Sequence, residues 1–114
     1  MNDLTWRKAT LDQLAKDFNM AGTDLPYFQG GENLEKIIHK LGSEIAKLRE
    51  SPELWNNLNY RIDIPVNLLV EVKLNNEFAE LYLFRSFQKV WLRRQFSANS
   101  SKDDEEANEK HLKP

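Results

Sequence analysis

The stretch ENLEKIIHKLGSEIAKLRE, residues 32–50, carries the strongest structural pattern in the chain. Its large aliphatic residues recur at steps of four and three, with Ile37 beside them: Leu34, Ile38, Leu41, Ile45 and Leu48. This spacing predicts a helix with one apolar face. The run covers about two heptads, so we expect packing inside the chain's own bundle, with a two-stranded coiled coil as the alternative. Gly42 either permits a close helix approach or is neutral.

The residues that follow this helix contain a helix-start signal. Ser51-Pro52-Glu53 is typical of a helix start, because serine caps, proline tolerates the first position and the acid meets the dipole. We expect Leu54, Trp55 and Leu58 to form the buried face of that next helix.

The N-terminal 31 residues form an arm in this interpretation. Thr10 caps a short helix over 11–20, and the glycine-rich and proline-containing segment 21–31 is a loop. The apolar residues in that loop are expected to pack over the core, with an exposed docking peptide as the alternative: Leu25, Tyr27 and Phe28.

Residues 60–74 allow two structures. Tyr60, Ile62 and Ile64 alternate with polar residues, as in one strand of a β-hairpin. The helical alternative is preferred, with Pro65 as the first residue of a short helix, because a lone hairpin is only marginally stable.

The last helix is expected over 76–97. At 100° per residue its core face holds Leu83, Phe87, Val90 and Trp91, with Phe84 beside them. Leu81 and Leu92 lie on a different flank. A helix that is apolar on several sides is either central in a bundle or covered by a partner chain.

A basic ladder runs along the same helix, formed by Arg85, Lys89 and Arg93, with the aromatics Tyr82 and Phe96 close to the same line. Arg94 belongs to the same candidate basic surface. Such a ladder can contact phosphates, which makes nucleic acid a possible partner. The total charge of −2 gives no general attraction to nucleic acid or to acidic membranes, so a solvated or ion-paired face is the favoured interpretation.

The composition suits one domain of 114 residues with 40% hydrophobic residues and a modest core. Residues 98–114 contain five acids, three lysines and one large apolar residue, Leu112, which predicts a disordered acidic tail. The chain shows no signal-peptide pattern and no long apolar run, so we expect a cytoplasmic protein without membrane contact.

Residues for catalysis or metal binding are sparse. The chain has no cysteine, its two histidines, His39 and His111, show no metal-ligand spacing, and no phosphate-binding or nucleophile motif occurs. Arg61 and Asp63 are expected to form a structural ion pair; with Tyr60 they are the weakest of three functional hypotheses, a small-ligand or enzyme site. We therefore expect no enzyme activity and no cofactor.

The segments NYRIDIP, 59–65, and FQKVWLRRQFS, 87–97, resemble a small uncharacterised bacterial family. In that family a YRID-type turn precedes a helix bearing Gln-Lys-Val and a trailing Arg and Ser. The resemblance covers about residues 33–97. It implies a compact helical protein and supports a helix at 65–74; it implies no activity.

These observations predict an all-α fold, a bundle of about four helices, with an arm over 1–31, a helical core over 32–97 and the tail. The alternative is an α+β fold with a hairpin at 60–74. The expected function is non-catalytic: an interaction or adapter domain that self-associates, as a homodimer for example. Its candidate interface residues are Leu81, Phe87, Trp91 and Leu92. The alternative is a nucleic-acid-binding accessory protein that uses the basic ladder.

Overall fold

The computed structural model describes residues 4–28 and 31–111, and for 97–111 it describes the backbone alone. Five helices lie in these residues: α1 (Leu4–Ala21), α2 (Leu34–Leu48), α3 (Pro52–Ile62), α4 (Val66–Glu71) and α5 (Asn75–His111). The described residues contain no strand, so the all-α prediction is confirmed and the hairpin alternative at 60–74 is wrong. Because α4 has only six residues, the bundle has about four substantial helices, as expected.

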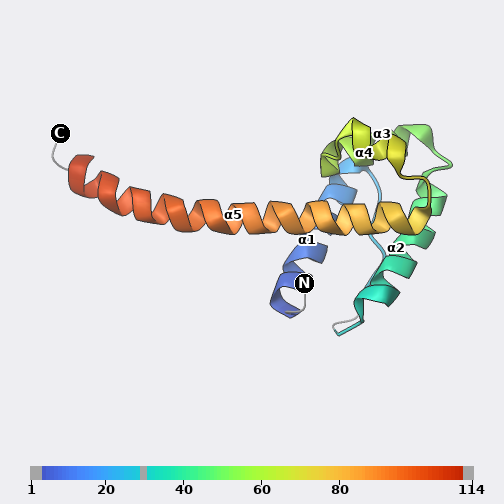
Figure 1. Cartoon of the computed structure of the whole chain (residues 1–114), viewed down its shortest axis with the longest axis horizontal. Helices are drawn as coiled ribbons and strands as arrows, with labels where there is room; N and C mark the ends of the chain where they lie inside the picture. The colour runs from blue at the N-terminus through green and yellow to red at the C-terminus, as the bar shows by residue number, and fades with distance from the viewer. Residues whose placement is uncertain (1–3, 29–30, 112–114) are drawn as a thin grey trace.

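Helix α5 is the common element of the bundle. It packs along both α1 and α2, and α3 packs mainly on α1. In Figure 1, α5 runs the full width of the molecule and crosses in front of α1, while α2, α3 and α4 gather around its N-terminal half. The C-terminal half of α5 extends beyond the other helices.

The core lies where α1, α2 and α3 meet the first half of α5. Tyr82 and Phe18 are its largest fully buried side chains, and their rings meet edge to face at 6.4 Å. Trp55 of α3 packs against Phe78 at 5.0 Å in the same geometry. Aliphatic side chains fill the rest of this cluster: Leu14, Ile37, Leu41, Ile45, Leu58 and Ile62.

Helix α1 begins earlier than the sequence predicted. It starts at Leu4 instead of residue 11, and Thr10 lies buried in its interior. The Thr10 hydroxyl donates a hydrogen bond of 2.7 Å to the carbonyl of Trp6, so it is no N-cap. The prediction failed because the first turns are held by tertiary packing: the Trp6 ring lies 5.5 Å from that of Phe87.

Helix α2 is confirmed, with its buried face turned slightly from the predicted one. Ile37, Leu41 and Ile45 are buried at the centre, while Leu34 is exposed. The side chain of Asn33 caps the helix by accepting a 2.8 Å bond from the Lys36 amide. The predicted stripe included Leu34, which instead lines an open groove beside the start of α5.

Gly42 permits the close approach that was one of its two expected roles. A Cβ atom at this position would overlap the side-chain oxygen of Asn76, at the start of α5. The absence of a side chain at Gly42 therefore lets α2 and α5 meet directly.

The turn between α3 and α4 also differs from the prediction. Helix α3 starts at Pro52 after Ser51, as expected, but the Ser51 side chain makes no capping hydrogen bond. The helix ends at Ile62, and its C-cap residue, Asp63, adopts the left-handed conformation with φ of 65°. Pro65 precedes the first helical residue of α4 and is not part of the helix. Ile64, between them, is buried and anchors the turn.

Part of the loop after α1 packs over the core. Leu25 and Phe28 pack against the buried cluster, as predicted, but Tyr27 is exposed. Gly22, with φ of 95°, supplies the left-handed residue that follows the end of α1.

The last helix was expected to end at residue 97, but its backbone continues to His111, beyond the other helices. An isolated helical segment of this polar composition is marginal in water. The disorder expected for residues 98–114 therefore stays a prediction for the tail in solution; residues 112–114 lie outside the described residues.

Candidate interaction surface

A line of polar contacts fixes one flank of α5 against α1. The Lys89 ammonium lies 3.0 Å from the carboxylate of Asp17 and donates a second bond, of 2.8 Å, to the carbonyl of Arg61. One turn further, Arg93 donates to the side-chain oxygen of Gln13 at 2.9 Å. Because Asp17 is buried, this ion pair is shielded from solvent on the carboxylate side.

Arg85 secures the turn between α3 and α4. Its guanidinium donates to the Asp63 carboxylate at 2.9 Å and to the Asp63 carbonyl at 3.0 Å. Asp63 thus pairs with Arg85, and the expected pair between Arg61 and Asp63 does not form. The sequence prediction failed because the left-handed cap of α3 turns Asp63 toward α5.

Arg94 completes the set of cations, and its partner is aromatic. Its guanidinium carbon lies 4.0 Å from the centre of the Trp6 ring, which in turn packs on Phe87. All four members of the basic surface, Arg85, Lys89, Arg93 and Arg94, therefore make contacts within their own chain.

Tyr82 has a role that the helical wheel missed. Its side chain is completely buried, although the wheel placed it beside the basic ladder. Its hydroxyl donates a 2.5 Å hydrogen bond to Asn59, which is also buried. Burial raises the pKa of this hydroxyl far above its usual value, and the positive charge of Arg49 offsets only part of the effect.

The outer face of α5 points away from the bundle and carries large apolar side chains together with two glutamines. We define it by the positions that repeat at steps of four and three along this side: Leu81, Phe84, Gln88, Trp91 and Gln95, with Leu92 at its edge. Phe84 is 58% exposed, Trp91 44% and Leu92 42%, while Leu81 is half-buried. Large aromatic side chains with this exposure are typical of docking sites.

Two predicted core residues therefore belong to the surface. Trp91 and Phe84 were expected in the core, and both are exposed. Of the predicted interface residues, Leu81, Trp91 and Leu92 share the outer face. Phe87 lies at its border, half-buried beneath Trp6. The difference arises because α1, α2 and α3 all pack on the opposite side of α5, which leaves no element to cover these positions.

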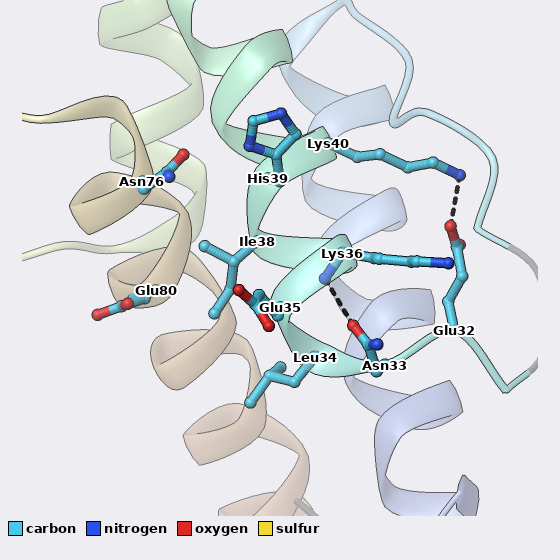
Figure 2. Close-up of a pocket in the computed structure, with 10 residues that line it drawn as sticks. All are labelled: Glu32, Asn33, Leu34, Glu35, Lys36, Ile38, His39, Lys40, Asn76 and Glu80. Carbon is cyan, nitrogen blue, oxygen red and sulfur yellow. Dashed lines mark hydrogen bonds and ion pairs between the residues drawn. The ribbon is translucent and has the colours of Figure 1, made fainter.

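An open groove of about 840 Å³ lies between the start of α2 and the start of α5. Figure 2 shows its lining, with Ile38 and His39 on α2 facing Asn76 on α5. Lys40 forms a 2.7 Å ion pair with Glu32 at one edge. The groove mixes apolar and polar groups without a convergent set of charges.

Sequence reasoning missed a second exposed apolar area, around α4. Tyr60, Val66, Val70 and Leu74 are all largely exposed. The alternation of apolar and polar residues at 60–74 was the available signal, since it places apolar side chains on opposite sides of a short helix. Tyr60 and Asp63, the small-ligand hypothesis, border an open pocket of about 510 Å³.

No three metal-ligating side chains cluster within residues 4–28 and 31–96. None of the helices, over the part described, has the length and apolarity needed to cross a bilayer.

The chain matches no protein-family model, no curated protein and no solved structure. The resemblance of segments 59–65 and 87–97 to a bacterial family stays a prediction.

Proposed function

We propose that this protein is a non-catalytic interaction domain that associates with a second copy of itself through the outer face of α5. The observation that carries the proposal is the set of exposed apolar side chains on that face, Phe84, Trp91 and Leu92, next to the half-buried Leu81, on a helix that packs against the bundle with its other side.

The energetics favour covering this face. Burying a large apolar side chain is worth about 1.5–3 kcal/mol, and aromatic residues dominate the binding energy of interfaces. The supporting side of α5 is joined to its neighbours by the Lys89–Asp17 ion pair, whose carboxylate is buried, and by the more exposed Arg85–Asp63 pair. A preorganised helix loses little conformational entropy on docking, which strengthens the association.

Nucleic acid binding finds less support. Arg85 and Lys89 pair with acids of their own chain, and Arg93 is engaged by Gln13. Contacts to phosphate would have to compete with these bonds. A solvated, internally paired cation row fits the overall charge of −2 better.

Light scattering over a range of concentrations tests the proposal. The purified chain should shift from monomer toward dimer as its concentration rises, and Leu92→Glu should remain a folded monomer. A chain that stays strictly monomeric up to about 1 mM would rule out self-association of any useful strength.

A further inference from the structure

We infer that the second copy docks antiparallel, with the two-fold axis passing α5 at the level of residue 86. In this arrangement Glu80 of each copy pairs with the partner's Arg94. This inference rests on the proposed self-association and specifies its geometry.

The spacing of the outer face supplies the register. Leu81, Gln88 and Gln95 occupy positions equivalent to a of a heptad, and Phe84 and Trp91 occupy positions equivalent to d. In an antiparallel pair, an a residue of one helix faces a d residue of the other. Centring the pair at residue 86 sets Leu81 against the partner's Trp91, and Phe84 against the partner's Gln88.

This arrangement matches large side chains with smaller ones. Each Trp91 faces a leucine, and each Phe84 faces a glutamine, so the layers can interdigitate. In a parallel pair each residue would instead face the same residue of the partner. Trp91 would meet the partner's Trp91 and Phe84 the partner's Phe84, so these two layers would be crowded and the layers between them underfilled.

The charges beside the seam agree with the same register. Glu80 and Arg94 each precede an a residue, at positions that face each other in an antiparallel pair. Both are exposed, and Figure 2 shows the Glu80 side chain directed away from α2. Within the described part of the chain, Glu80 has no ion-pair partner and Arg94 has no acidic one. Two-fold symmetry forms this Glu80–Arg94 contact twice.

The parallel alternative would direct Glu80 toward the partner's Arg85. That arginine is already committed: two hydrogen bonds of 2.9 and 3.0 Å hold it on Asp63, and its side chain is only 23% exposed. The antiparallel pair brings the two Arg85 side chains across the symmetry axis, where Asp63 already neutralises each of them. Arg94 stacks on Trp6 but pairs with no acid among the described residues, so it is the cation that remains for Glu80.

A spin-label distance measurement distinguishes the two orientations. The natural chain has no cysteine, so Gln95→Cys introduces a single attachment site. In the antiparallel pair residue 95 lies opposite the partner's residue 77, eighteen positions away along the helix, which gives a separation of roughly 27 Å. In a parallel pair the two labels lie about 10 Å apart. A separation near 10 Å in a confirmed dimer would overturn the antiparallel inference and leave the proposed function standing.

Charge reversal tests the specific contact. Glu80→Arg and Arg94→Glu should each weaken dimerisation about tenfold, and the double variant should recover to within about threefold of the natural chain. Lys16→Glu, on an exposed position of α1, serves as the control and should change dimerisation little. Losses that simply add in the double variant would refute the contact. Absence of any dimer in the natural chain would refute the proposed function itself.

Discussion

The Lys89 ammonium lies 3.0 Å from the Asp17 carboxylate, although 72 positions separate the two residues in the chain. This contact joins the first helix to the last. It also orients α5. With Lys89 turned toward α1, the outer face of α5 points away from the bundle and is left uncovered.

Lys89→Ala should destabilise the fold by about 3 kcal/mol, because it leaves the buried Asp17 carboxylate without its counter-charge. Replacing both residues with leucine should cost less than the single change. Lys8→Ala, which removes the exposed Lys8–Asp12 pair of α1, is the matched control and should cost under about 0.5 kcal/mol. Urea unfolding measures all three; equal losses for Lys89→Ala and Lys8→Ala would contradict a buried, stabilising pair.

Tyr82→Phe should destabilise the protein by about 1–2 kcal/mol, because Asn59 then loses its buried hydrogen-bond donor. The raised pKa of Tyr82 adds a pH signature. Since the folded state holds the phenolic proton more tightly than the unfolded state, stability is independent of this group below the ordinary pKa of 10.0 and falls as pH rises above it.

Unfolding of the natural chain and of Tyr82→Phe between about pH 8 and pH 11 checks this sign. The natural chain should lose stability more steeply than the variant above about pH 10. Parallel pH profiles for the two proteins would show that the Tyr82 hydroxyl ionises in the folded state as it does in the unfolded one.

Gly42→Ala should be more favourable in an Asn76→Ala background than in the natural chain. Alanine gains about 1 kcal/mol of helix propensity over glycine, but in the natural chain its Cβ meets the Asn76 side chain. A double-mutant cycle by thermal unfolding measures the coupling. A cycle without coupling would mean that the Asn76 side chain does not lie against Gly42.

The natural chain should show no measurable binding to single-stranded DNA at about 50 mM salt, where phosphate contacts are strongest. The reason is that Arg85, Lys89 and Arg93 already bond within the chain. Fluorescence anisotropy with a labelled oligonucleotide checks this. Binding that weakens with added salt, and that is lost in Arg93→Ala, would revive the nucleic-acid hypothesis.

Local sequence signals predicted α2 and the start of α3. The apolar stripe through Leu41 and Ile45 predicted α2, and Pro52 marked the first residue of α3, although the Ser51 side chain does not cap it and the Asn33 cap of α2 was not predicted. The start of α1 could not be predicted in this way, since Trp6 is held by Phe87 from the far end of the chain.

The candidate site was predicted only in part. The four-residue spacing correctly separated Arg85 and Lys89 from the apolar positions. Their partners, Asp63 and Asp17, come from other helices and leave no trace in local spacing. Likewise, a wheel based on hydrophobicity assigned Trp91 to the core, because it cannot show on which side of α5 the neighbouring helices pack.

Sedimentation equilibrium of Phe84→Glu beside the natural chain tests the central proposal most directly. The natural chain should approach twice the single-chain mass of 13.4 kDa as its concentration rises, while Phe84→Glu should stay folded and monomeric. Val66→Glu, at a residue on α4 that is 74% exposed, is the matched control and should dimerise like the natural chain. A natural chain that remains at 13.4 kDa, or a Phe84→Glu variant that dimerises equally well, would contradict the assignment of the outer face of α5 as the interface.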